Sequence, residues 1–367
     1  MSTLLSRLFS RRQAATVPPM DGVLRPNEAL DELSAIGSIA APDNLVAAKG
    51  KVFFSSGSDL YFLDRPGNKI SAEPFDRFSA EITALDASPE GALAVGVDGT
   101  GIRIVGGAHD GVVLDVFDTQ PVNCVTALAF SGEDELFVCL GSGHNSAPDW
   151  QRDLMEKRSS GSLWQVGLKD KKARKLAGNL AFPNGILVRG DKLVVAESWN
   201  HRLLSLRIDG EKHAQAFTLA DLPGYPGRLA PAANGGAWLS VFAPRGQLTE
   251  FVLREDTYRN RMLRELSSEH WIAPTLRAGK AFTEPMQGGA VKVHGVHKAW
   301  APTRSYGLLI LLDSNLTPTH SFHSRADGKR HGIVSACELD GDVFIASRGN
   351  DVLCTMPVPH SGMEGTS

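Results

Sequence analysis

The 367-residue sequence has few cysteines and no metal-binding or redox pattern among them. The four cysteines are Cys124, Cys139, Cys337 and Cys354, and no two have the CxxC spacing of a zinc site or a thioredoxin-type motif. All four lie in strand-like apolar segments. We therefore expect buried free thiols in the reducing cytoplasm, although a Cys337–Cys354 bridge across neighbouring strands stays open.

Long hydrophobic runs are also missing. No window approaches 18 consecutive apolar residues, so we expect no transmembrane segment. The apolar residues near the N-terminus are interrupted by Arg7, Arg11 and Arg12, which makes a poor secretory signal. We expect residues 1–30 to form a flexible basic tail, with a weak membrane-surface contact as the alternative.

Charge of one sign is not in excess, and the commonest catalytic motifs are absent. The chain has 38 basic and 41 acidic residues and a net charge of -3, which argues against a nucleic-acid partner. It contains no GxSxG, HExxH or GxxxxGK motif. These absences argue against an α/β-hydrolase serine nucleophile, a zinc-protease helix and a phosphate-binding loop.

Glycine is abundant, with 37 residues, and short strand-like units recur along the chain. Each unit has an apolar strand, a polar turn and a second, more apolar strand. The units begin at Asp43, Ile82, Val125, Asn184, Arg228 and Gly332. Four of the five spacings are 39 to 59 residues and one is 104, against about 40–50 residues for a propeller blade. The pattern predicts one six-bladed β-propeller over residues 31–360, with helical insertions at 146–161 and near 258–276.

Three segments resemble the strictosidine synthase-like family, part of a wider group of propellers that includes gluconolactonases and paraoxonases. They are AFPNGILVRGDKLVVAESWNHR at 181–202, LPGYPGRLAPAANGGAWLSVFAPR at 222–245, and 305–347, which is similar to the family's final blade. The resemblance implies a six-bladed propeller that handles a small molecule in its central channel. Family members perform different chemistry on this scaffold, so the reaction must be argued from the channel residues.

In the wider group, hydrolytic members hold calcium in the channel. The resemblance implies Asp43 and Asn184 as metal ligands here. Where the family pattern has Asp-Asn after Tyr-Pro, this chain has Gly227 and Arg228. A guanidinium there would repel a divalent ion and could pair with Asp43 instead. Calcium, an empty polar channel and an Arg228–Asp43 ion pair are therefore the alternatives, and in the strictosidine synthase branch no metal is needed.

Four residues are our catalytic candidates: Arg228 as a cation, and His144, Glu197 and His331 as acid–base groups near the channel mouth. Each acid–base group also has a structural interpretation. His144 and His331 could be ordinary surface histidines, and Glu197 could form a salt bridge with the neighbouring Arg202 or His201. The predicted substrate contacts are Asn145, Trp199, Phe242 and Arg304.

These residues favour a small-molecule hydrolase of the lactonase or esterase type. Calcium or Arg228 would polarise the substrate carbonyl, and His144 or Glu197 would activate water. One alternative is a metal-free condensing enzyme or lyase of the strictosidine synthase type, although its channel glutamate corresponds to Val334 here. The other is a non-catalytic propeller that binds a ligand. A hydrolase predicts that activity falls when Asn184 or His144 is replaced by alanine.

Overall fold

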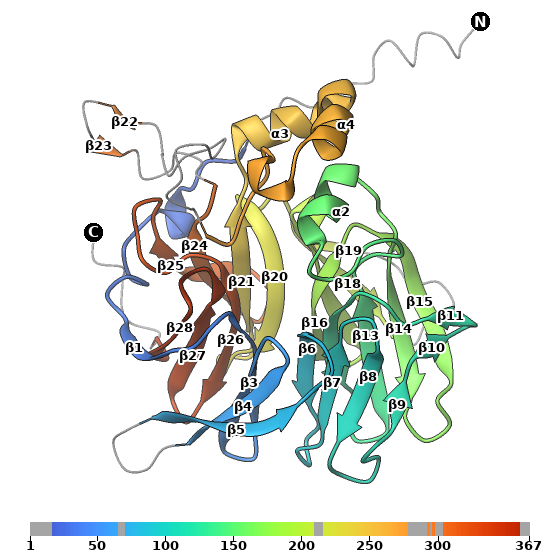
Figure 1. Ribbon diagram of the computed structural model, residues 1–367. Helices are drawn as coiled ribbons and strands as arrows, with labels where there is room; N and C mark the ends of the chain where they lie inside the picture. Colours follow the sequence, from blue (N-terminus) through green and yellow to red (C-terminus); the bar gives the residue numbers. More distant parts are fainter. Residues whose placement is uncertain are drawn as a thin grey trace, which may run out of the picture.

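The computed structural model describes residues 17–64, 70–208, 216–277 and 304–359, together with 292–293 and 296–297. Six four-stranded antiparallel sheets form the blades of a propeller (Figure 1). Their first strands contact one another in a closed ring. The predicted six-bladed β-propeller is confirmed.

The strands of blades one to three are β2 (Pro42–Ala48), β3 (Lys51–Ser56), β4 (Asp59–Asp64) and β5 (Ser71–Arg77); β6 (Ile82–Ala87), β7 (Leu93–Val97), β8 (Gly101–Val105) and β9 (Val113–Leu114); and β12 (Val125–Phe130), β13 (Glu135–Leu140), β14 (Gly161–Gly167) and β15 (Ala173–Leu180). The strands of blades four to six are β16 (Pro183–Arg189), β17 (Lys192–Glu197), β18 (Arg202–Arg207) and β19 (Ala216–Leu219); β20 (Gly224–Pro231), β21 (Ala237–Pro244), β24 (Gly307–Leu312) and β25 (Pro318–Ser324); and β26 (Ile333–Leu339), β27 (Asp342–Ser347), β28 (Val352–Pro357) and β1 (Ser34–Ser38). Two short hairpins lie outside these sheets: β10 (Val116–Phe117) with β11 (Gln120–Pro121), and β22 (Lys292–Val293) with β23 (Val296–His297).

The fifth blade corrects one prediction. We assigned residues 305–324 to the final blade, but β24 and β25 complete the sheet of β20 and β21. The register pairs Trp238 with Leu311. The long spacing before the last unit therefore contains half of blade five as well as an insertion.

The insertions form helices at one end of the propeller (Figure 1). The first contains α2 (Trp150–Glu156), as predicted. The second contains α3 (Gln247–Arg254) and α4 (Asp256–Glu265), so helix begins eleven residues, about three turns, earlier than we expected. On α3, Val252 and Leu253 are buried against the propeller, whereas Phe251 is exposed.

Both ends of the chain build the sixth blade. Strand β1 pairs antiparallel with β28, so an N-terminal segment closes the ring. Of the predicted basic tail, residues 1–16 lie outside the described part of the chain. Later residues of that segment contact the propeller: Leu30 is buried, and the amide of Asn27 donates to the Ser321 carbonyl at 2.9 Å.

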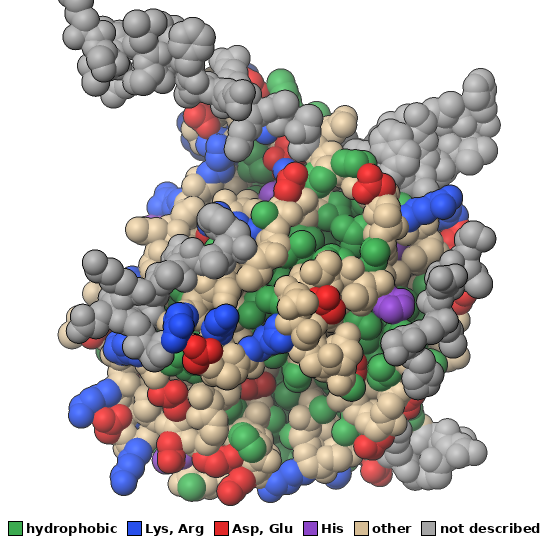
Figure 2. Space-filling model, turned by 180° about the vertical axis from the view of Figure 1, so that it is seen from behind, with side chains coloured by type: hydrophobic (Ala, Val, Ile, Leu, Met, Phe, Trp, Pro, Cys, Tyr) green, Lys and Arg blue, Asp and Glu red, His purple; other side chains and the backbone are tan. Residues whose placement is uncertain are grey.

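The core consists of apolar clusters packed between neighbouring sheets. All four cysteines are buried free thiols, as predicted, so the Cys337–Cys354 bridge does not form. Burial raises the pKa of Cys124 to about 12, so this thiol stays protonated. No helix in the described ranges has the length and hydrophobicity needed to cross a bilayer. On the face shown in Figure 2, acidic and basic side chains are interspersed among the described residues.

Candidate functional site

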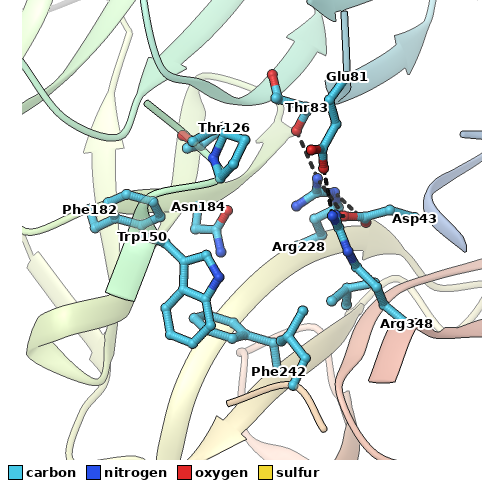
Figure 3. Close-up of a pocket in the computed structure, with 14 residues that line it drawn as sticks. Asp43, Glu81, Thr83, Thr126, Trp150, Phe182, Asn184, Arg228, Phe242 and Arg348 are labelled. Carbon is cyan, nitrogen blue, oxygen red and sulfur yellow. Dashed lines mark hydrogen bonds and ion pairs between the residues drawn. The ribbon is translucent and has the colours of Figure 1, made fainter. Parts of the chain in front are cut away.

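A cavity of about 140 Å³ lies where the first residues of the inner strands meet, next to α2 (Figure 3). We call it the mouth cavity. It is lined by Asp43, Glu81, Thr83, Thr126, Ala147, Pro148, Trp150, Phe182, Asn184, Arg228, Phe242, Leu276, Val334 and Arg348.

Irregular strand pairing brings side chains into this cavity. Each inner strand has a register shift near its beginning, as between Ile82 and Ala84 in β6 or between Pro183 and Gly185 in β16. The residues inside such shifts include Thr83 and Asn184, which line the cavity. A β-bulge bends its strand and redirects a side chain. Six bulged strands around one axis therefore place a ring of side chains at the channel mouth.

Two arginines and two carboxylates form a charged cluster on one side of the cavity (Figure 3). Arg228 donates from Nε to Asn44 Oδ1 and from Nη2 to the Thr83 carbonyl, both at 2.8 Å. Its Nε also lies 3.3 Å from Asp43 Oδ1. The Arg228–Asp43 ion pair, one of the three alternatives for this channel, is therefore present.

The second arginine, Arg348, was not predicted. It lies in the 3-10 turn that follows β27, η4 (Arg348–Asn350). Its Nη1 is 3.1 Å from Asp43 Oδ2, and its Nη2 is 2.5 Å from Glu81 Oε1. The two guanidiniums thus share Asp43, and Glu81 balances the remaining charge.

The pKa values of the two arginines shift in opposite directions. For Arg228, burial lowers the pKa, and the charge of Asp43 offsets this only in part. For Arg348, burial also lowers the pKa, but Asp43 and Glu81 outweigh it and the pKa is raised. Both guanidiniums remain charged at neutral pH, because arginine is not deprotonated in proteins.

These residues do not fit a calcium site. Calcium takes six to eight oxygen ligands. Both carboxylate oxygens of Asp43 already accept from arginines, and the Asn44 amide oxygen accepts from Arg228. In the described ranges, no three His, Cys, Asp or Glu side chains are placed to share a metal ion. The expected pair of ligands, Asp43 and Asn184, is therefore corrected to an ion-paired carboxylate and an amide.

The predicted metal ligand Asn184 lines the mouth cavity, whereas the predicted acid–base residue Glu197 does not. No hydrogen bond joins the Asn184 side chain to another described residue. Glu197 is buried, accepts the Ala181 N–H at 2.7 Å and pairs with Arg202 Nε at 2.5 Å. This is the structural salt bridge that we kept as the alternative for Glu197.

The two predicted histidines also lie away from the cavity lining. His144 is exposed in the loop after β13, where its backbone N–H donates to Ser142 Oγ at 3.1 Å. His331 is buried, so its interpretation as a surface histidine is wrong. Its Nε2 lies 2.7 Å from the Arg325 carbonyl and its Nδ1 2.8 Å from Ser305 Oγ. Because a carbonyl only accepts, Nε2 carries the proton, and burial lowers the pKa of this ring.

Of the four predicted substrate contacts, one lines the mouth cavity and three do not. Phe242 lines the cavity. Trp199 does not line the cavity. It stacks on the lining residue Phe182, with ring centroids 4.5 Å apart. Asn145 holds α2, because its amide donates to the carboxylate of Asp153 at 3.1 Å. Arg304 is buried and donates to the Glu269 carbonyl at 2.9 Å, outside the cavity lining.

The mouth cavity has an apolar wall opposite the charged cluster. Phe242 is the only residue of this wall that we predicted from the sequence. Trp150, at the start of α2, packs edge-on against Phe242 with ring centroids 5.3 Å apart. Phe182 precedes the Pro-Asn-Gly segment and completes the aromatic side of the cavity (Figure 3). Two features of the sequence could have identified lining residues that we missed. Phe182 belongs to the AFPNG motif. Glu81 directly precedes its inner strand, much as an acidic residue opens the first blade.

Comparison with known proteins gives relatives in two groups. The adipocyte plasma membrane-associated protein of Salmo salar is 26% identical over 92% of this chain and 81% of its own length. The mouse protein of the same name is 23% identical over 75% of this chain and 72% of its own. Strictosidine synthase-like protein 10 of Arabidopsis thaliana is 29% identical over 36% of each chain. No family model matches the sequence.

Solved structures share the fold at low sequence identity. A gluconolactonase of Xanthomonas campestris superposes with a TM-score of 0.55 at 11% identity, covering 95% of this chain and 99% of that one. Regucalcin, a calcium-binding protein of Agrobacterium tumefaciens, gives 0.53 at 9% identity, covering 88% and 93%. The chain is therefore a six-bladed propeller of the gluconolactonase and regucalcin fold, with strictosidine synthase-like and adipocyte plasma membrane-associated proteins as its homologues.

Proposed function

We propose that the protein hydrolyses lactones or small carboxylic esters in the mouth cavity. The observation that carries the proposal is the placement of Arg228. It lines the cavity, three contacts fix its Nε and Nη2, and its Nη1 has no hydrogen bond to another described residue. A guanidinium fixed in this way is preorganised to donate to a carbonyl oxygen as negative charge develops there.

The charge balance supports an uncharged substrate. Two guanidiniums face two carboxylates, so a carboxylate or phosphate ligand would find no surplus of positive charge. The opposite wall is aromatic. A cavity of about 140 Å³ resembles in size the engineered cavity of about 150 Å³ that binds benzene, so one small ring with a carbonyl group would fill it.

Glu81 is the proposed general base. One carboxylate oxygen is held by Arg348, and the other has no hydrogen bond to a described residue. Water attacks the carbonyl carbon while Glu81 takes its proton, and Arg228 stabilises the oxyanion. The carbon–oxygen bond then breaks, and Glu81 returns the proton to the leaving alkoxide. An ester gives an acid and an alcohol, and a lactone gives one open hydroxy acid.

The test is a hydrolysis assay with a neutral six-membered lactone and with phenyl acetate. We expect turnover by the unaltered protein. Arg228→Gln and Glu81→Gln should each lower kcat/KM by about 100-fold or more. Asp170→Asn is the control, because it makes the same acid-to-amide change on an exposed turn between β14 and β15. Turnover by both altered proteins at the unaltered rate would contradict the proposal.

Two other outcomes of these assays would support a different function. A ligand that raises the melting temperature without turnover would support the non-catalytic binding propeller. A product formed from an amine and an aldehyde, with esters and lactones inert, would support the synthase-type reaction. The second outcome would need a base other than a last-blade glutamate, because Val334 lines the cavity at that position.

The cytoplasm is the proposed location. It rests on the cysteines: all four are buried free thiols. Thiols persist in a reducing compartment, whereas secreted proteins tend to form disulfides.

A further inference from the structure

A second cavity, of about 290 Å³, lies farther along the central channel. We call it the rear cavity. Residues from the later parts of all six inner strands line it, among them Ala87 of β6, Phe130 of β12 and Pro231 of β20. Arg228 and Thr126 line both cavities and so lie between them. The rear cavity thus adjoins the mouth cavity and extends toward the opposite ends of the inner strands.

The residues that line the rear cavity are mainly aliphatic, with two acidic residues among them. Aliphatic side chains come from every inner strand; examples are Leu45, Leu85, Leu128, Ile186, Leu229 and Ala336. The carboxylates are Asp86 of β6 and Glu338 of β26. Apart from Arg228, the lining contains no basic side chain.

Neither carboxylate has an ion-pair partner among the described residues. Asp86 accepts the Phe130 N–H at 2.7 Å. Glu338 accepts the Ala233 N–H at 2.8 Å and the indole N–H of Trp238. All of these donors are neutral, in contrast to the two guanidiniums that hold Asp43 in the mouth cavity.

The acidity of Asp86 reflects this lack of a cation. Burial raises the pKa of Asp86 to about 7, and the backbone N–H groups of Phe130 and Ala87 offset this only in part. The Asp86 residue is only partly exposed, and charges withdrawn from water in proteins are normally paired. A cation that entered the rear cavity would favour the ionised carboxylate and would gain a strong hydrogen bond from it.

We infer that the rear cavity binds a small organic cation, a primary ammonium with an apolar body, with Asp86 as its counter-ion. The aliphatic walls suit the body, and the carboxylates suit the head. Calcium does not fit this lining, because its two carboxylates fall far short of the six to eight oxygen ligands that calcium takes. The inference does not depend on the proposed hydrolysis, which uses the other cavity.

The test compares benzylammonium with benzyl alcohol, a neutral molecule of nearly the same shape. Binding is followed by isothermal titration and by the melting temperature. We expect benzylammonium to bind at least about tenfold more tightly than the alcohol. Asp86→Asn should abolish this preference, while its amide oxygen can still accept from Phe130. The control is Asp313→Asn, because Asp313 also accepts only backbone N–H groups but lies outside the rear cavity.

Glu81→Gln separates the two cavities. If the ammonium bound in the mouth cavity, this substitution would weaken binding and Asp86→Asn would not. That result would overturn the inference, as would equal binding of the alcohol or no binding of benzylammonium. Glu338→Gln is a second variant should Asp86→Asn not fold, and it should also weaken the ammonium selectively.

Discussion

At the scale of single residues, Asp43 is the point where the charges of the mouth cavity meet. Its two carboxylate oxygens lie 3.3 Å from Arg228 and 3.1 Å from Arg348, and its side chain is only 6% exposed. The same carboxylate accepts the Asn44 N–H at 2.6 Å. Asp43 therefore keeps two guanidiniums together in a place where they would otherwise repel each other.

Replacing Asp43 by asparagine should lower the free energy of unfolding by about 3–5 kcal/mol. The change leaves Arg228 and Arg348 side by side with one carboxylate fewer, and an uncompensated buried charge is costly. Urea unfolding measures the effect. The matched control is Asp59→Asn, which breaks an exposed pair with Arg77 and should change stability by no more than about 1 kcal/mol. Similar losses in both variants would contradict the role given to Asp43.

His323 should make stability depend on pH. It is fully buried beside Tyr306, and burial lowers its pKa to about 4 from 6.5. Below pH 6.5 the unfolded chain binds a proton that the folded protein still excludes. The stability linked to His323 is therefore complete above pH 6.5 and is lost as the pH falls toward 4.

The measurement compares unfolding free energies at pH 7 and pH 5 in the unaltered protein and in His323→Gln. The difference between the two proteins should shrink by about 2 kcal/mol at pH 5, since each unit of pH is worth about 1.4 kcal/mol per proton. His270→Gln, at an exposed position, should show no such change. A difference that is the same at both pH values would rule out this titration.

At the scale of strands and helices, the sequence predicts the inner strands well and the rest of the site poorly. The Pro-Asn-Gly segment and the repeated turns locate the strand starts, and hence Asn184 and Arg228. Arg348 and Trp150 come from a turn after β27 and from a helix in an insertion. Their positions depend on how blades pack around the axis, which spacing along the chain does not reveal. Glu197 was misplaced for the same reason: it lies on β17, but its side chain turns to Arg202.

The closing strand was also missed. Strand β1 is five residues long and has a bulge between Ala35 and Gly37, so its alternation is weak. Its partner, β28, lies at the other end of the chain. Nothing in the local sequence of either strand identifies the other, because the pairing becomes possible only when the ring is complete.

Removing residues 1–38 should destabilise the sixth blade. The edge of β28 would lose its partner, and residues such as Cys354, which pairs with Ala35, would be uncovered. We expect a lower melting temperature that a synthetic peptide covering residues 20–41 restores, while a scrambled peptide does not. Melting curves with and without each peptide measure the effect. An unchanged melting temperature would show that β1 adds little to the blade.

At the scale of the whole molecule, the number of blades follows from the repeats, but their composition does not. The insertion between β21 and β24 separates the two halves of blade five, so the later half was assigned to the next blade. Pairing of Ala237 with Leu312 restores the correct sheet. A repeat unit can be recognised from its own turns, whereas membership of a sheet depends on contacts across an insertion of any length.

The stability of the whole propeller should not depend on calcium. Arg228 and Arg348 occupy the charged side of the channel mouth, so adding calcium or a chelator should shift the melting temperature by less than about 1 °C. Elemental analysis should find calcium well below one equivalent. A melting temperature that falls with chelator would mean that oxygen ligands other than those around Asp43 hold the ion.

The pairing of β1 with β28 determines when the ring can close during biosynthesis. Ser38 donates to the Asp351 carbonyl across 313 residues of chain. At about 5–20 residues per second, a ribosome takes roughly 15–60 seconds to make that stretch. Throughout this interval the first strand is finished and its partner does not yet exist. The nascent chain therefore waits with an unpaired strand edge, a period in which a chaperone would protect it from pairing with another copy.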